Sequence, residues 1–378
     1  MLRKEVDEPH VETYDVGSLP PRASAETLER GAEAYASLSH LLGESPEAET
    51  FEKVLLGALV DKLRAGVDIP NYPQFRDMNQ MFLKLLRGHI KEGDIYISHG
   101  ITARPRASIP EVEVIKRNLS FILDEAEIDH LRIKFCVTGP YTLSLQFRHR
   151  DDRLMEELAS ALSRIVEASI FKVGKGETAL MAVDEPTFGL VDDPLLDRGS
   201  EARESLLKSW EKLFSAASSR GLETIIHLHD TSDPLYLEVE HLDIVESHVD
   251  DPLYSDDEII RSVLKAGKRV KASISRSDFD ALIAQSLGIP PGSDEAPRRI
   301  GAVWSEVKRG RMEAECFLEE VELMRRRLRI IVKRFGAENV PYAGPECGLR
   351  GFPDYPSALE TLRRVSEASH RWSRRDKL

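Results

Sequence analysis

The sequence has few cysteines, no long apolar run and fewer basic than acidic residues. Its three cysteines, Cys136, Cys316 and Cys347, are an odd number and too sparse for a disulfide framework, which indicates a reducing compartment. No stretch approaches the ~18 uninterrupted apolar residues of a membrane helix. The N-terminal residues also lack the apolar centre of a secretory signal. We therefore expect a cytoplasmic protein with no membrane partner.

The charge balance argues against a second class of partner. The 378 residues include 52 Lys and Arg against 65 Asp and Glu, a net charge of −13. Nucleic acids require a positive field on the protein that binds them, so we expect no nucleic-acid partner. Hydrophobic residues make up 41% of the chain and charged residues 31%, which is typical of a globular protein with a large core.

Short apolar runs alternate along the chain with segments of helical periodicity. In residues 152–173, for example, Leu154, Leu158 and Leu162 recur on one helical face. Eight strands separated by helices favour a (β/α)₈ TIM barrel with insertions. A doubly wound sheet is the alternative, but no Gly-x-Gly-x-x-Gly follows any of the strands. The predicted strands are 14–16, 67–69, 131–137, 179–183, 224–228, 243–247, 269–274 and 340–343, and further predicted helices are 201–219, 256–266 and 357–369.

We interpret residues 1–378 as a single catalytic barrel with two insertions. Residues 91–110 combine an apolar run with several prolines, which predicts a hairpin or flap, and residues 286–297 are rich in Gly, Pro and acid, which predicts a loop. A long charged helix is expected over 298–335. Its Glu319-Glu320 and Arg325–Arg327 runs are expected to form a solvated face.

Polar residues gather where the predicted strands end. The carboxyl ends of barrel strands share one face, and barrel enzymes build their sites there. Residues far apart in the sequence would therefore converge on one cavity, which is the main argument for an enzyme. The strand-end residues are Gly17, Ser18, Asp184, Glu185, His227, His229, His248 and Cys347.

Three histidines and one cysteine in this set suggest a metal. His227 and His229 are two residues apart, so their side chains share a face of an extended segment. With His248 and Cys347 they offer three imidazoles and a thiol, a suitable set for tetrahedral zinc. Their wide spacing fits a site assembled from different strands rather than a zinc finger. The alternative is that the paired histidines are strand-end residues satisfied by their neighbours.

For the cysteines and the acid pair, a purely structural role is the alternative to a functional one. Cys136 and Cys316 lie in apolar patterns and are expected to pack in the core, whereas Cys347 precedes Gly348 on a turn. Asp184 and Glu185 offer two carboxylates to a substrate. Alternatively, they are an acid pair at a helix N-terminus.

Four motifs, in order, resemble the C-terminal catalytic barrel of cobalamin-independent methionine synthase and its short archaeal relatives. They extend from about residue 14 to about residue 355, nearly the whole chain. The motifs are Val16-Gly17-Ser18-Leu19-Pro20, Thr138-Gly139-Pro140-Tyr141-Thr142, Val183-Asp184-Glu185-Pro186, and Pro345-Glu346-Cys347-Gly348-Leu349 followed by Gly351-Phe352-Pro353.

The resemblance implies a zinc-dependent methyltransferase that converts homocysteine to methionine. Zinc would bind the homocysteine thiol and lower its pKa, so that a thiolate attacks an activated methyl group. Gly17 and Ser18 would hold the amino acid's carboxylate through backbone N–H groups. Asp184 would take the ammonium group, with Glu185 beside it. His227 and Cys347 match two of the family's zinc ligands.

The metal set departs from the family pattern at two positions. His229 replaces the cysteine of a His-x-Cys pair, and His248 aligns with a glutamate, although Glu246 and Asp250 stand close by. Three neutral histidines and one thiolate leave a zinc site at about +1, against about −1 for the family set. A more positive zinc would hold a substrate thiolate more tightly and leave it a poorer nucleophile.

The substrate positions depart as well. Tyr72 stands where the family has a glutamate for the homocysteine amino group, Gln146 where a tryptophan stacks on folate, and Ser275 near the place of a proton-shuttle histidine. The family's N-terminal barrel has no counterpart in the sequence. We therefore expect a methyl-corrinoid protein, methylcobalamin or a methylated pterin as donor rather than a polyglutamyl folate. Another thiol such as coenzyme M as acceptor, or a non-catalytic barrel that binds a methylated cofactor or partner, remain alternatives.

Overall fold

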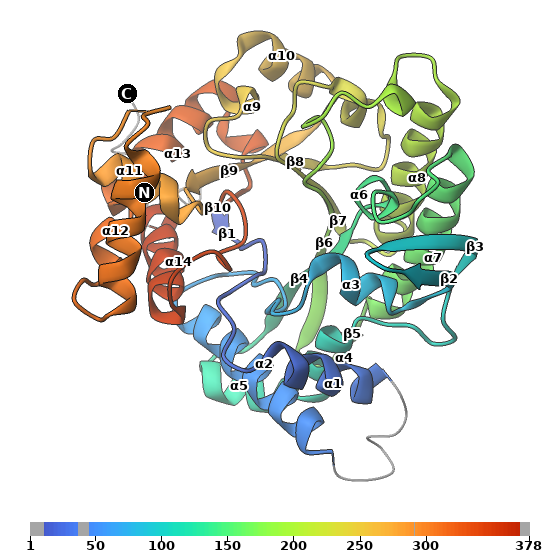
Figure 1. Cartoon of the computed structure of the whole chain (residues 1–378), viewed down its shortest axis with the longest axis horizontal. Helices are drawn as coiled ribbons and strands as arrows, with labels where there is room; N and C mark the ends of the chain where they lie inside the picture. Colours follow the sequence, from blue (N-terminus) through green and yellow to red (C-terminus); the bar gives the residue numbers. More distant parts are fainter. Residues whose placement is uncertain (1–10, 37–44, 291, 371–378) are drawn as a thin grey trace, which may run out of the picture.

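The computed structural model describes residues 11–36, 45–290 and 292–370, which form an α/β fold around one parallel sheet. Figure 1 shows the strands arranged around the middle of the molecule with helices outside them. Neighbouring strands along this path are all parallel. Their spatial order is β1 (Glu12–Thr13), β10 (Tyr342–Pro345), β9 (Arg269–Ser275), β8 (Ile244–Glu246), β7 (Glu223–Leu228), β6 (Gly176–Glu185) and β4 (Leu131–Thr138).

The barrel prediction is confirmed in part. Seven of the eight predicted strands have a counterpart, although β1 lies two residues before the predicted 14–16. The predicted strand 67–69 is wrong as a regular strand. The carboxylate of Asp68 accepts hydrogen bonds from the backbone N–H and hydroxyl of Thr13, and Pro70 has no N–H to donate.

The segment after residue 66 nevertheless spans the space between β1 and β4. Ile69 N donates to Thr13 O at 2.9 Å, and Lys134 N donates to Pro70 O at 3.0 Å. An isolated parallel bridge joins Asn71 to Lys134. Hydrogen bonds therefore connect the two ends of the strand path without a regular strand.

The principal helices follow the predicted apolar periodicity. In α7 (Asp152–Ser169) the predicted apolar residues face the core, and the side chain of Asp151 accepts a hydrogen bond from Leu154 N at 2.8 Å. Residues 172 and 173, expected in that helix, form the short strand β5 (Lys172–Val173) against β6. The remaining helices are α1 (Ala25–Ala36), α2 (Pro46–Arg64), α3 (Met78–Leu83), α4 (Pro110–Arg117), α5 (Leu119–Ala126), α6 (Pro140–Ser144), α8 (Glu201–Ser218), α9 (Pro252–Ser255), α10 (Asp257–Lys265), α11 (Phe279–Ser286), α12 (Ala296–Lys308), α13 (Val321–Phe335) and α14 (Tyr355–His370), with short 3₁₀ turns η2 (Pro194–Leu196), η3 (Pro234–Glu238), η4 (Ala314–Phe317) and η5 (Ala337–Asn339).

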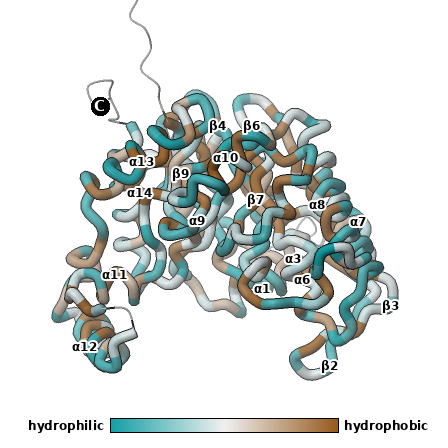
Figure 2. The backbone as a smooth tube through the Cα atoms, turned by 90° about the horizontal axis from the view of Figure 1, so that it is seen from above, coloured by the Kyte–Doolittle hydropathy of each residue, from teal (hydrophilic) through white to brown (hydrophobic). Residues whose placement is uncertain are grey.

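A hairpin occupies much of the first predicted insertion. Strands β2 (Leu86–Glu92) and β3 (Ile95–Ala103) pair antiparallel, so the hairpin begins five residues before the predicted 91–110. The second predicted insertion lies between α11 and α12. Its Pro291, like residues 1–10 examined for a secretory signal, lies outside the described residues. Figure 2 shows the hairpin and helices α11 and α12 extending from the same side of the molecule.

The expected long charged helix is wrong, since η4 separates α12 from α13 and Gly310 takes a positive φ of 65° after α12. The solvated face is wrong for Glu319, which is buried and accepts two hydrogen bonds from Arg327, each at 2.7 Å. Within residues 11–36, 45–290 and 292–370, every helix is too short or too polar to cross a bilayer.

Candidate metal centre

Three adjacent strands place their polar residues in one row. Asp184 of β6 is in register with His227 of β7, and His227 is in register with Glu246 of β8. Register partners on parallel strands direct their side chains to the same face of a sheet. All three side chains are buried, so the row lies inside the ring of strands.

The four predicted metal ligands lie together at the carboxyl ends of these strands. One ligand atom from each of His227, His229, His248 and Cys347 lies within 4.8 Å of the others. The Sγ atom of Cys347 is 3.6 Å from Nε2 of His229. Ligand atoms ~2.0–2.3 Å from a tetrahedral zinc ion stand about 3.3–3.8 Å apart. The donor set and the separation of Cys347 from His229 therefore fit a zinc ion.

Protonation favours a thiolate at Cys347 and, without a metal, an imidazolium at His227, which would have to release its proton to become a ligand. Burial raises the pKa of the Cys347 thiol, but His227, His229 and His248 outweigh it and hold that pKa well below its ordinary value. Burial lowers the pKa of His227, but Cys347 and Glu246 raise it to about 10. For His229, burial prevails over Cys347 and the pKa is lowered. The thiolate that a metal requires is thus already favoured.

The two neighbouring carboxylates, Glu246 and Asp250, lie outside the group of four ligand atoms that converge among the described residues. Asp250 is largely exposed and pairs with Arg276 at 2.6 Å. Glu246 is fully buried, and its Oε2 is 2.8 Å from Nζ of Lys271.

Asp184 presents an unpaired carboxylate oxygen close to the cluster. The residue is 4% exposed, and its Oδ1 makes no hydrogen bond within the described residues. Burial raises its pKa, while His227 and Lys134 lower it in part. A buried acceptor without a donor is rare in a folded protein, so this oxygen is available to a ligand that donates hydrogen bonds.

The loop of Gly17 and Ser18 lies beside Cys347. Leu349 N donates to Ser18 O at 2.8 Å, and a Cβ atom on Gly348 would clash with Oγ of Ser18. Gly17 has a φ of 135°, a conformation that favours glycine. The structure therefore brings the predicted carboxylate loop next to the predicted metal ligand.

Glu185 does not lie with the other predicted site residues. It is fully buried, and its carboxylate accepts hydrogen bonds from Tyr141 N at 3.0 Å, Thr142 N at 2.7 Å and Trp210 Nε1 at 2.9 Å. These are the first residues of α6 and a side chain of α8. Its position corresponds to the alternative of an acid at a helix N-terminus, and we do not retain it as a substrate residue.

The three residues that differ from the family at its substrate positions are Tyr72, Gln146 and Ser275. The hydroxyl of Tyr72 is buried and donates to Cys136 O at 3.0 Å. Gln146 lies beside the hairpin, where its backbone carbonyl accepts a hydrogen bond from Tyr96 N at 2.8 Å. Ser275 is buried at the end of β9, and its hydroxyl donates to Arg276 O at 3.2 Å.

Sequence reasoning missed several residues around the cluster. Glu346 accepts hydrogen bonds from Val249 N at 2.8 Å and Ser277 N at 2.9 Å, so it ties the loops after β8 and β9 to the residue before Cys347. Lys134 and Lys271 are fully buried near Glu246. A lysine within an apolar strand is buried only with a partner, and this was a signal that could have identified both.

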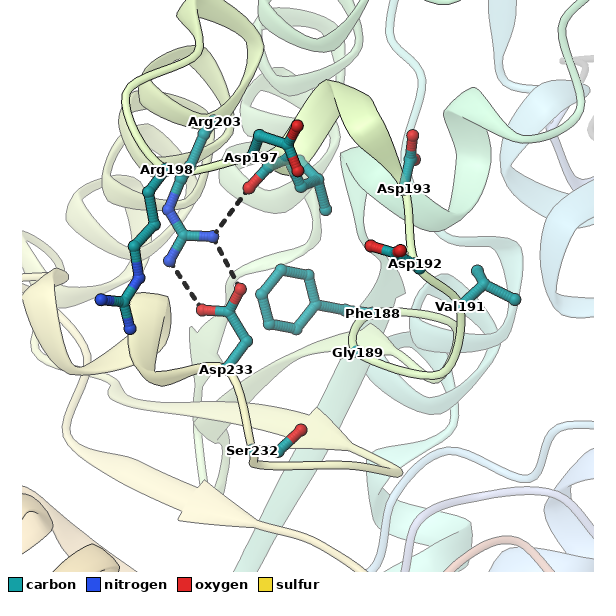
Figure 3. Close-up of a pocket in the computed structure, with 11 residues that line it drawn as sticks. Phe188, Gly189, Val191, Asp192, Asp193, Asp197, Arg198, Arg203, Ser232 and Asp233 are labelled. Carbon is teal, nitrogen blue, oxygen red and sulfur yellow. Dashed lines mark hydrogen bonds and ion pairs between the residues drawn. The ribbon is translucent and has the colours of Figure 1, made fainter.

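A polar pocket of about 390 Å³ lies between the loops that follow β6 and β7 (Figure 3). Phe188 is among the residues that line it, and Arg203 pairs with Asp233 at 2.6 Å on one side. None of the four converging ligands lines this pocket. Gly189, which lines this pocket, lies near Asp230, the residue after His229, because a Cβ atom added to Gly189 would be 3.3 Å from Asp230.

Comparison with known proteins gives one sequence relative and several structures. No protein-family model matches the chain. It is 25% identical over 142 residues to the methionine synthase of Sulfurisphaera tokodaii, a match that covers 36% of this chain and only 42% of that protein.

The B12-independent methionine synthase from Shewanella sp. W3-18-1, solved in complex with selenomethionine, matches with a TM-score of 0.59 and 17% identity over 95% of this chain and 97% of that chain. A methyltransferase from Methanosarcina mazei matches with a TM-score of 0.49 and 14% identity over 96% of this chain and 94% of that chain. The TM-score of 0.59 to the first structure shows a shared fold. Together with the sequence relative, it confirms the resemblance to the cobalamin-independent methionine synthases that the four motifs predicted.

Proposed function

We propose that this protein is a zinc-dependent methyltransferase that transfers a methyl group to a thiol, with homocysteine as acceptor and methionine as product. The observation that carries the proposal is the convergence of His227, His229, His248 and Cys347 within 4.8 Å, beside the unpaired carboxylate oxygen of Asp184. A metal for the sulfur and an anion for the ammonium are what a thiol amino acid requires.

The residues of the chain would divide the work as follows. His227, His229, His248 and Cys347 would hold zinc, which when bound lowers the pKa of a substrate thiol. Asp184 would accept hydrogen bonds from the ammonium group. The loop of Gly17 and Ser18 beside Cys347 would bind the carboxylate through its backbone.

The reaction forms a bond between the substrate sulfur and the methyl carbon and breaks the bond between that carbon and its donor. The thiol proton is released. A methyl-corrinoid protein, methylcobalamin or a methylated pterin is proposed as donor, because Gln146 offers no aromatic face for folate.

We also propose that the segment after residue 66 closes the sheet into a (β/α)₈ barrel, and that residues 1–378 form one domain with insertions at 91–110 and 286–297. A cytoplasmic location and the absence of a nucleic-acid partner stay predictions.

The decisive experiment measures zinc per chain and then methyl transfer. We expect about one zinc, and transfer from methylcobalamin or a methylated pterin to homocysteine but not to 4-mercaptobutanoate, which is homocysteine without its amino group. Equal transfer to both thiols would contradict the role of Asp184.

Tyr72 favours a second acceptor class. Its hydroxyl already donates to Cys136 O, so this position supplies no carboxylate for an ammonium group. Coenzyme M, a thiol without an amino group, is therefore the second acceptor to assay. A chain that holds no metal even when prepared anaerobically would favour a non-catalytic barrel that binds a methylated cofactor or partner.

A further inference from the structure

Glu246 lies directly behind the metal centre and is surrounded by donors. Its Oε1 is 3.2 Å from Nδ1 of His227, and its Oε2 accepts from the hydroxyl of Tyr14 at 3.0 Å and from Nζ of Lys271 at 2.8 Å. Lys134 approaches Oε1 at 4.0 Å. Glu246, Lys134 and Lys271 are all fully buried, so solvent does not weaken these interactions.

The two lysines draw this carboxylate away from the converging ligands. Within the described part of the chain, the group of four ligand atoms forms without Glu246. Both ammonium groups also lie near the ring of Tyr14, with Nζ of Lys134 4.9 Å and Nζ of Lys271 5.3 Å from the ring centroid. Glu246 is thus held in place by three side chains, none of which is a metal ligand.

Lys271 also contacts the end of β10, the strand that leads to Cys347. Its Nζ donates to Pro345 O at 2.6 Å, two residues before Cys347. One buried ammonium therefore contacts both the carboxylate behind His227 and the strand end that leads to Cys347. His227 and Cys347 come from strands far apart in the sequence, so this contact fixes one relative to the other.

We propose that Glu246 is a positioning residue for the metal centre and not one of its ligands. Its Oε1, 3.2 Å from Nδ1 of His227, would accept the Nδ1–H and so leave Nε2 as the atom that binds metal. Within the described residues both ring nitrogens of His227 and Oε1 of Glu246 are buried without a hydrogen-bond partner, so Nδ1 is free to pair with Oε1 and Nε2 with a ligand. Lys271 holds Glu246 and the Cys347 loop in one arrangement.

This inference rests on the proposed metal site, and binding of Co²⁺ in place of zinc tests it. Metal-free protein is titrated with Co²⁺ in competition with a chromophoric chelator, and the visible spectrum is recorded. We expect E246Q to bind Co²⁺ about 10–100-fold more weakly than wild type, the usual effect of losing an outer partner of a metal-bound histidine. The thiolate-to-cobalt band and the tetrahedral ligand-field pattern should be retained.

Glu223 provides a matched control on the neighbouring strand β7. Its carboxylate also pairs with a cation, Arg269 at 2.7 Å, and accepts from a tyrosine hydroxyl, that of Tyr342, but at the start of the strand. E223Q should bind Co²⁺ like wild type. H248A, which removes a proposed ligand, should instead change the ligand-field pattern.

Tyr14→Phe keeps the test decisive if E246Q does not fold. It removes one hydrogen bond to Glu246 and leaves every charge in place, so we expect a smaller loss of Co²⁺ affinity with an unchanged spectrum. Unchanged affinity in both variants, or a ligand-field change in E246Q like that of H248A, would overturn the positioning role. A wild-type protein that binds no Co²⁺ would refute the metal site itself.

Discussion

The Nε2 atom of His229 lies 3.6 Å from the Sγ atom of Cys347, although the two residues are 118 positions apart in the chain. They lie this close because each follows a strand of one parallel sheet, and the carboxyl ends of parallel strands lie at the same end of the sheet. Each strand contributes only one or two polar side chains. The centre therefore depends on the whole sheet rather than on any local motif.

Replacing Cys347 with serine should remove the metal. A serine hydroxyl remains protonated where the Cys347 thiol is held as a thiolate by three histidines, so the anionic donor is lost. We expect zinc content to fall from about one per chain to well below half, as measured by elemental analysis of purified protein. Cys316→Ser is the control. The expectation that Cys316 packs in the core is wrong, because this residue is exposed, so this variant should leave zinc content unchanged; loss of zinc in both variants would indicate a general effect on folding.

Replacing Asp184 with asparagine should weaken binding of the amino acid without removing the metal. A hydrogen bond to a charged group is worth about 1.5–3 kcal/mol, so we expect homocysteine affinity to fall about 10–150-fold by calorimetry. Binding of 4-mercaptobutanoate should change little. Asp192 is exposed on the neighbouring pocket, and Asp192→Asn should bind homocysteine normally. If Asp184→Asn weakens both thiols equally, the carboxylate does not recognise the ammonium group.

Replacing Glu185 with glutamine should lower stability rather than metal binding. The carboxylate accepts hydrogen bonds from three N–H groups in a buried position, and a glutamine amide would present its own N–H₂ to some of them. We expect the free energy of unfolding to fall by about 2–4 kcal/mol in urea titrations. Glu204, on the surface of α8, provides the control E204Q. A stable E185Q protein with impaired homocysteine binding would restore Glu185 as a substrate residue.

The contact between His370 and Asp68 should make stability depend on pH above 6.5, the ordinary pKa of a histidine. Nε2 of His370 is 2.7 Å from Oδ2 of Asp68, and the hydrogen bond to Asp68 raises the pKa of His370 above 6.5. The contribution is fully present below pH 6.5 and is lost as pH rises through the raised pKa. The side chains are about a third exposed, so it should amount to at most about 1 kcal/mol.

Urea unfolding between pH 6 and pH 9 measures this contribution. H370Q should lose stability less steeply with rising pH than wild type. His149 is exposed, and H149Q should retain the wild-type dependence. Parallel pH curves for wild type and H370Q would show that the pair contributes nothing.

Most of the strand path could be predicted from sequence because buried parallel strands are continuous apolar runs. The segment at 67–69 shows where this fails. Asp68 uses its side chain to satisfy Thr13, and a pattern of apolar residues does not reveal that competition. The long helix expected over 298–335 fails because Gly310 and the turn η4 interrupt it. Its expected solvated face fails because Glu319 is buried and paired with Arg327.

The sequence by itself determined which polar residues end the strands and hence which could meet. It could not decide between His248, Glu246 and Asp250, or between the two roles of the Asp184-Glu185 pair. Adjacent residues of a strand face opposite sides of the sheet, so Asp184 turns inward while Glu185 turns to α6. Likewise Glu246 is drawn to Lys271, 25 residues later in the chain. Only the tertiary structure brings those charges together, because contacts between strand ends depend on how the sheet curves and not on order along the chain.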